Sequence, residues 1–184
     1  MTFIVKHRQS SEAKLRASFG DPLIVDVTSR GPEPWVQFSP FFPHGGIPIP
    51  GAPSVVSESV EGLWQGLKVF ERAEVDPGKL GITSMKGLKR TVRRYGMCLG
   101  HRRDFEHDDV LLDYLEARRA IYLPAYRWVL EHRLSDLVDQ LREQGAARTV
   151  VLLDYETNVD VDDPRRPLSH AGLVAAWIEG RWPT

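Results

Sequence analysis

The sequence predicts an α+β fold, a single and mostly helical domain with a small β-sheet, from three observations. The chain of 184 residues is long enough for one well-buried domain and short for two. Apolar residues recur with helical spacing over 57–71 and 107–145. Two short runs, 22–28 and 148–154, are rich in Val, Ile and Leu, as buried strands are. Repeats and a domain boundary are not visible, so one domain over residues 1–184 is expected.

The predicted sheet contains "PLIVDVT" (22–28), the start of "RTVVLLDY" (148–154) and "PWVQF" (34–38), which is expected to pair with the first strand. Residues 39–53 follow and are too rich in Pro and Gly for a helix. This loop is also too apolar for a flexible linker. We expect it to pack on the body of the protein and to bury its large apolar side chains, which are Phe41, Phe42, Ile47 and Ile49.

A helix is predicted over 57–71, where the apolar side chains form one stripe at helical spacing. Its members are Val60, Leu63, Trp64, Leu67 and Phe70. Ser57 or Ser59 can cap its start, because serine oxygen accepts a hydrogen bond from a free N–H group of the first turn. The helix is expected to end near Glu71, before Asp76 and Pro77.

Three further helices are predicted: a short basic one over 84–96, a long helical region over 107–145 and a final helix over 167–180. Their expected boundary residues are caps at Asp108 or Asp109 and at Ser169, ends at Gly96 and Gly145, a break or kink at Pro124 and a restart at Ser135.

Composition excludes some classes of protein. Hydrophobic residues at 42% and charged residues at 27% are typical of a globular chain, and a net charge of −1 gives no bulk attraction to nucleic acid. No apolar run approaches the roughly 18 residues of a membrane span, and the first residues lack a signal-peptide core. The single cysteine, Cys98, cannot form an internal disulfide. A cytoplasmic location is therefore expected.

Charge is unevenly distributed along the chain. Residues 77–103 contain eight Lys or Arg and no Asp or Glu, whereas residues 154–163 are strongly acidic. Charge runs are usually solvated faces. The alternative is a cationic surface for phosphate beside an acidic, reactive one.

Glu61, Gln65 and Lys68 fall within about 60° of one helical face, beside Trp64. This row is either the solvated side of an amphipathic helix or part of a binding site. A carboxylate, an amide and an ammonium group beside an indole can hold a sugar or a nucleobase. The indole stacks on the ligand, the amide orients it and the carboxylate stabilises positive charge.

The segments "FSPFFPHGG" and "SVEGLWQGLKVF" resemble the "SNFYP" loop and the "SEHxYQAxKF" helix of the YbiA-like family, also called NADAR. "RRDFEHDDVLLDYLEARRAIY", "VVLLDYETNVD" and "LSHAGLVAAWI" are similar to its later segments, so the resemblance covers about residues 24–178. With Pro40 and Phe105 at positions of a family Asn and Trp, the chain resembles a divergent member. The resemblance implies a YbiA-like fold.

Members of that family cleave N-glycosidic bonds, in phosphorylated ribosyl intermediates of riboflavin synthesis or in ADP-ribose attached to guanine. The resemblance therefore implies a hydrolase with Glu61 and Asp154 as catalytic carboxylates, because such cleavage develops oxocarbenium character. Arg30, Lys68, Arg118 and Arg119 are candidates for phosphate binding, and at most one of the last two is expected to point into a pocket. The resemblance adds these substrate-binding residues: Ser39, Phe41, Trp64, Gln65, Phe105, Asn158 and Asp160.

Other chemistries find little support in the sequence. The six histidines lack metal-ligand spacing, no histidine pairs recognisably with Cys98, and phosphate-binding glycine motifs are missing. No metal and no cofactor are therefore expected. The expected partner is a phosphorylated ribosyl or ADP-ribosyl small molecule, either free or as a nucleic-acid adduct, and not a membrane. Two alternatives to the enzyme stay open: a nucleotide- or ADP-ribose-binding module without turnover, and a protein-interaction domain.

Overall fold

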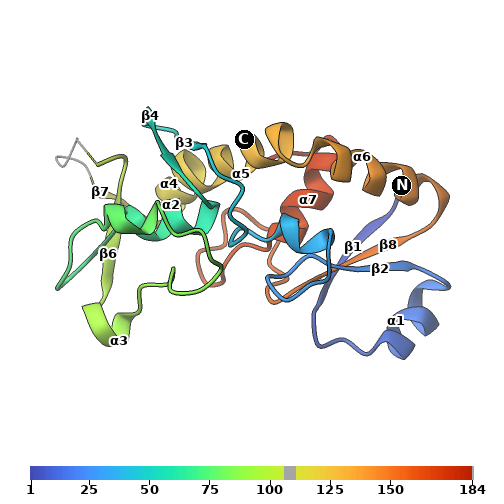
Figure 1. Ribbon diagram of the computed structural model, residues 1–184. Helices are drawn as coiled ribbons and strands as arrows, with labels where there is room; N and C mark the ends of the chain where they lie inside the picture. Colours follow the sequence, from blue (N-terminus) through green and yellow to red (C-terminus); the bar gives the residue numbers. More distant parts are fainter. Residues whose placement is uncertain (106–110, 184) are drawn as a thin grey trace. The chain divides into compact units, whose positions relative to one another are not determined.

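In the described part of the chain, helices and three small sheets form an α+β fold, as predicted (Figure 1). The computed structural model describes residues 1–105 and 111–183. The chain divides into two compact units: a terminal unit, Met1–Ser39 with Leu134–Thr184, and a central unit, Pro40–Arg133. The organisation as one domain stays a prediction. Within the described residues, no helix has the length and apolar character that a membrane crossing needs.

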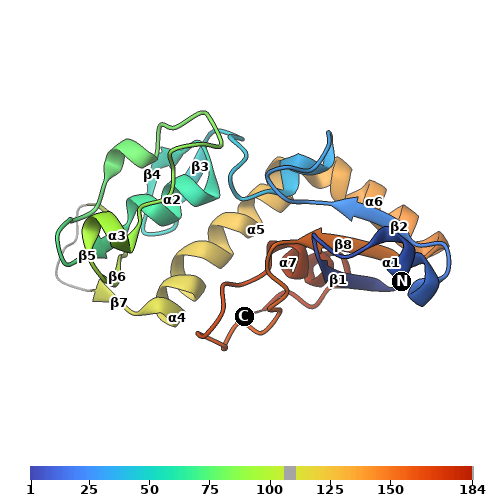
Figure 2. The same cartoon turned by 90° about the horizontal axis from the view of Figure 1, so that it is seen from below.

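The terminal unit is built on a parallel sheet in the order β1 (Phe3–His7), β8 (Val150–Asp154), β2 (Leu23–Asp26), which Figure 2 shows. The five residues of β8 are all buried, as expected for a central strand with a continuous apolar run. The strands predicted at 22–28 and 148–154 are thus confirmed, while β1 was not predicted. His7 pairs with Asp154 and Asp26 with Leu153, so all three strands end at the same edge.

Helices α1 (Glu12–Phe19), α6 (Ser135–Ala147) and α7 (His170–Ile178) complete the terminal unit. α7 packs on β1 and β8, and Ser169 caps it by accepting from the Gly172 N–H, as predicted. The predicted restart at Ser135 is confirmed, but α6 continues past Gly145 to Ala147.

The strand predicted over 34–38 is wrong, because Trp35–Phe38 forms the 3₁₀ turn η1. Pro32 and Pro34 have no N–H group to offer a sheet. Their carbonyl groups instead accept from the N–H groups of Val36 and Gln37, which closes the turn.

The central unit contains a hairpin and an antiparallel sheet. β3 (Ile47–Ile49) and β4 (Ala52–Ser57) form the hairpin, and β5 (Lys68–Phe70), β6 (Cys98–Arg102) and β7 (Leu111–Leu112) form the sheet. The hairpin begins inside the stretch predicted as a loop. Ile47 and Ile49 are fully buried as predicted, whereas Phe41 and Phe42 are only half-buried.

Helix α2 (Val60–Gly66) begins at the predicted cap, since Ser59 Oγ accepts from the Gly62 N–H. It ends five residues earlier than predicted. Glycine is a poor helix former, and Lys68–Phe70 pairs with β6 to form β5. Lys68 therefore lies on a strand, and the prediction that it shares a helical face with Glu61 and Gln65 is wrong.

The basic helix predicted over 84–96 is a single turn, α3 (Val92–Tyr95), which stops at Gly96 with a φ of 82°. It follows the short 3₁₀ turn η2 (Pro77–Lys79). The remaining residues of the predicted helix lie in bends and irregular backbone.

The long helical region begins at α4 (Tyr114–Ala117), which Asp113 caps, whereas the caps predicted at Asp108 or Asp109 lie outside the described residues. A π-helical turn, η3 (Arg118–Tyr122), follows and leads into α5 (Leu123–His132). In this turn the Leu123 N–H donates to the Arg118 carbonyl, five residues back. Pro124 therefore does not break the helix, because the wider turn accommodates its missing N–H group.

Candidate functional site

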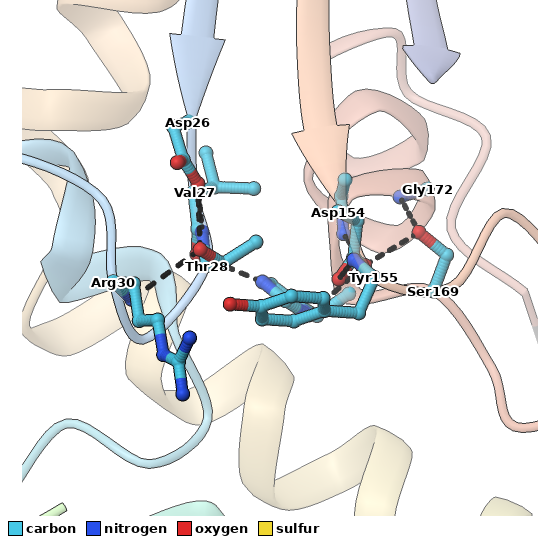
Figure 3. Close-up of polar contacts among 10 residues, drawn as sticks. Asp26, Val27, Thr28, Arg30, Asp154, Tyr155, Ser169 and Gly172 are labelled. Carbon is cyan, nitrogen blue, oxygen red and sulfur yellow. Dashed lines mark hydrogen bonds and ion pairs between the residues drawn. The ribbon is translucent and has the colours of Figure 1, made fainter. Parts of the chain in front are cut away.

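Two polar clusters contain most of the predicted site residues, one in each unit. The first lies at the carboxyl edge of the parallel sheet, where α/β proteins commonly place ligands. Figure 3 shows Asp26 at the end of β2 and Asp154 at the end of β8, with Ser169 and Gly172 at the start of α7.

Asp154 is the centre of this edge cluster, because four donors reach its buried carboxylate. Oδ1 accepts from the Tyr155 N–H at 2.7 Å. Oδ2 accepts from Ser169 Oγ at 2.7 Å, from the Ala171 N–H at 3.2 Å and from His170 Nδ1 at 3.0 Å. Burial raises the pKa of Asp154, but the His170 charge and these hydrogen bonds outweigh it and hold that pKa at about 2.

His170 links Asp154 to the neighbouring strand. Its Nε2 lies 2.8 Å from the Val27 carbonyl oxygen, while Nδ1 faces Asp154. Both partners are acceptors, so both ring nitrogens must donate and the imidazole is positively charged. Burial lowers the pKa of His170, yet the Asp154 carboxylate raises it above its ordinary value. The ion pair thus ties the ends of β2 and β8 to the start of α7.

The Asp26 carboxylate is held in the same way. Oδ1 accepts from the Thr28 N–H at 3.0 Å and from its hydroxyl at 2.7 Å, and Oδ2 accepts from Arg8 Nε at 2.8 Å. The Arg30 N–H donates to Thr28 Oγ1 at 3.3 Å, but the Arg30 side chain is exposed. Arg30 is therefore placed near this edge without a buried position for its guanidinium group.

The other predicted residues of the terminal unit serve the backbone. Asn158 Nδ2 donates to the carbonyl groups of Asp163 and Arg166, which holds the segment between β8 and α7. Asp160 is exposed, and its Oδ1 accepts from the Asp162 N–H. Ser39 is buried. These contacts give Asn158 and Asp160 a loop-forming role.

The second cluster surrounds α2 in the central unit. Both Glu61 and Gln65 are buried, at 8% and 4% exposure, so the solvated-face interpretation does not apply to them. Gln65 Nε2 donates to Glu61 Oε1 at 2.8 Å, and Gln65 Oε1 accepts from the Arg90 N–H at 2.9 Å. The backbone of Arg90 thereby fixes the orientation of the amide, and the amide fixes that of the carboxylate.

Lys68 supplies a partly buried positive charge to this α2 cluster. Burial lowers the pKa of Lys68, while the Glu61 carboxylate acts in the opposite direction. Its Nζ lies 5.7 Å from the centre of the Trp64 ring, a cation–π arrangement. The charge of Lys68 thus interacts with the Glu61 carboxylate and with the Trp64 indole.

Trp64 is already covered by other rings. The His101 ring lies 3.9 Å from it, and Tyr114 and Tyr122 approach edge-on at 6.0 and 5.7 Å between ring centres. Only 9% of Trp64 is exposed. The indole therefore forms a packed wall of the α2 cluster rather than an open stacking surface.

His101 was not predicted as a site residue. It is 1% exposed, and in the described part of the chain neither ring nitrogen has a hydrogen-bond partner. Burial, and then the charge of Lys68, lower the pKa of His101 to about 3, so the ring is neutral. The only signal for it is the pairing of His101 with Lys68 across β5 and β6, which sequence spacing does not reveal.

Of the other predicted residues in the central unit, Phe105 and Arg118 border this cluster, whereas Arg119 is exposed. Phe105 lies against α2, because a Cβ added to Gly66 would be 3.3 Å from its Cζ. The buried Arg118 guanidinium lies 4.7 Å from the Tyr114 ring, while Arg119 is exposed, so at most one of this pair is turned inward, as expected. Phe41 is half-buried under Lys89.

His101→Phe should raise the free energy of unfolding by about 1–2 kcal/mol, because the ring contact with Trp64 is kept and two buried nitrogens without partners are removed. Urea unfolding would measure the difference. His132→Phe, at an exposed ring on α5, is the control and should change it by less than about 0.5 kcal/mol. A clear loss of stability in His101→Phe would contradict the burial of unpaired nitrogens.

Comparison with known proteins identifies one family. A family model described as "Family of unknown function (DUF6939)" matches residues 7–174. No curated protein and no solved structure matches the chain.

Proposed function

The chain belongs to DUF6939, a family of unknown function, and we propose that it hydrolyses the N-glycosidic bond of a ribosyl nucleotide or an ADP-ribosyl conjugate. The proposal includes a YbiA-like architecture, a phosphorylated substrate and a cytoplasmic location. It rests on the resemblance of the α2 segment to the YbiA-like family and on the chemistry of the α2 cluster.

The observation that carries the proposal is the state of Glu61. Its carboxylate is buried and oriented through Gln65, and within the described residues no donor contacts Oε2. An oriented carboxylate with one unused oxygen is suited to contact a reacting sugar or an attacking water. Solvated glutamates on helix surfaces lack this fixed orientation.

The reaction that this group suits is displacement at the anomeric carbon. As the C–N bond breaks, positive charge develops on the ribosyl ring, and a nearby carboxylate lowers the energy of that state. Water forms the new bond to the anomeric carbon, and the departing base takes up a proton. In this proposal Glu61 stabilises the charge or accepts the proton of the attacking water, and Lys68 and Arg118 attract the phosphate.

Asp154 fits a different role from the predicted second catalytic carboxylate. Four donors occupy its oxygens, and a pKa of about 2 makes it a weak base. A general base works best with a pKa near the working pH. We assign Asp154 the role of anchoring the sheet edge, which leaves Glu61 as the reactive carboxylate of the proposal.

A binding module without turnover is the second candidate. The hydrogen bonds that occupy the Asp154 carboxylate favour it, because glycoside hydrolysis generally uses two available carboxylates. The two candidates differ in whether the base is released.

The test is incubation of the purified protein with ADP-ribosyl guanosine and with a phosphorylated ribosylaminopyrimidine, followed by chromatography of the products. The hydrolase should release the free base from at least one of them. Saturable binding without release would support the binding module. Neither binding nor release of either compound would contradict both.

A further inference from the structure

A separate pocket of about 410 Å³ lies within the terminal unit, among β1, the segment after β8, α7 and the residues that follow α7. Its volume falls within the range of about 300–1,000 Å³ found for small-molecule sites. Most of its lining is apolar and includes Phe3, Val5, Leu168 and Leu173. No part of the proposed hydrolytic site contributes to it, so a ligand bound here would be independent of the proposed function.

Small residues on α7 leave room for this pocket. Gly172, Ala175 and Ala176 all line it, and Ala176 is half-buried. Val159 forms another part of the wall and is 62% exposed, an unusual state for a large apolar side chain. A Cβ on Gly172 would approach Val159 Cγ1 to 2.7 Å, so the glycine lets Val159 pack this closely. An apolar ligand here would cover a side chain that is otherwise in water.

Among the described residues that line the pocket, Arg181 is the one with a charged side chain. Its N–H donates to the Ala176 carbonyl, which fixes the backbone just after α7. Its guanidinium group pairs with Glu179, and its side chain is 69% exposed. Exposed ion pairs are weak, and a guanidinium group has five N–H donors, so Arg181 can also bind an anion at the rim.

We propose that this pocket binds a small carboxylic acid, with its apolar chain against Val5, Val159 and Ala176 and its carboxylate on Arg181. The apolar lining suits the hydrocarbon chain of such an acid, and the single cation suits its one carboxylate. A polyphosphate would find only that one cation among the residues of the pocket wall that the structure describes. Affinity should then increase with chain length, by about fourfold for each methylene group buried.

The experiment is a titration of the ¹⁵N-labelled protein with butanoate, hexanoate and octanoate, followed by NMR. The amide signals of Gly172 and Arg181 should shift and saturate, with tighter binding for each longer acid. Octylammonium has the same chain with a positive end and should bind at least about tenfold more weakly than octanoate. No saturable shift with any acid, or equal binding of octanoate and octylammonium, would overturn the proposal.

Two pairs of variants locate the site. Ala176→Leu fills the pocket and should weaken octanoate binding at least about tenfold, whereas Ala146→Leu, at an exposed position of α6, should leave it unchanged. Arg181→Gln should remove the preference for octanoate over octanol. Glu179→Gln should strengthen that preference, because the Glu179 carboxylate no longer competes with octanoate for Arg181. Equal octanoate binding by the two leucine variants would show that the acid does not bind in this pocket and would contradict the proposal.

Discussion

Asp154→Asn should lower the free energy of unfolding by about 3–5 kcal/mol, the cost of breaking a buried ion pair by removing one partner. The amide keeps the size of the side chain but removes the charge that stabilises the His170 imidazolium. It also brings an NH₂ group into a site where the neighbours of the carboxylate are donors. Urea unfolding of the native and variant proteins would measure the loss.

The pH dependence should identify the ion pair as the cause. The pKa of Asp154 is lowered to about 2 from 3.8, so its contribution is present above about pH 4 and lost as the pH falls towards 2. The pKa of His170 is raised from 6.5, so its contribution is present below about pH 6.5 and lost as the pH rises through the raised value. The difference between native protein and Asp154→Asn should therefore be largest between about pH 4 and 6.5.

Asp162→Asn is the matched control, since Asp162 is an exposed aspartate in the segment that follows the same strand. It should change the stability by less than about 0.5 kcal/mol. A small effect of Asp154→Asn, or a difference independent of pH from 4 to 8, would contradict the charged state that the geometry assigns to this pair.

Glu61→Gln should lower the turnover of a ribosyl N-glycoside by roughly 100-fold or more while leaving substrate binding mostly intact. The glutamine keeps the shape of the side chain, and its oxygen can still accept from Gln65 Nε2. It loses the negative charge that the oxocarbenium-like state requires. Chromatographic measurement of base release at saturating substrate would give the ratio of turnover numbers.

Glu143→Gln makes the same chemical change at an exposed position of α6 and is the control. Its turnover should equal that of the native protein. Equal turnover in Glu61→Gln and Glu143→Gln would exclude Glu61 as the reactive carboxylate.

Elements with strong local signals could be predicted from the sequence. β2 and β8 are apolar runs that pair in one sheet, and Ser59 and Ser169 are serines at the starts of apolar helices, so local chemistry decides these elements. β1 was missed because its lysine and histidine weaken the apolar pattern, and it forms only by pairing with β8, distant in the chain. The aromatic and β-branched residues of Trp35–Phe38 predict a strand, but Pro32 and Pro34 favour the turn that forms.

The α2 cluster shows the same division between local and tertiary causes. The nearness of Glu61 and Gln65 follows from helical spacing and was predicted. Lys68 lies on β5 and not on the helix, because α2 ends at Gly66 and β6 provides a pairing partner. It still belongs to the cluster. His101 joins only through that pairing and its contact with Trp64, so no spacing in the sequence could reveal it.

The most direct test of the central claim, that Glu61 serves hydrolysis of an N-glycosidic bond, is a single-turnover measurement of base release with the protein in excess over ADP-ribosyl guanosine or the phosphorylated ribosylaminopyrimidine. The native protein should convert the bound substrate in one exponential phase to free base and the corresponding sugar phosphate or ADP-ribose. Glu61→Gln should bind the same compound and release base at least about 100-fold more slowly. Native protein that binds the compound and releases no base, or Glu61→Gln that releases it at the native rate, would contradict the account.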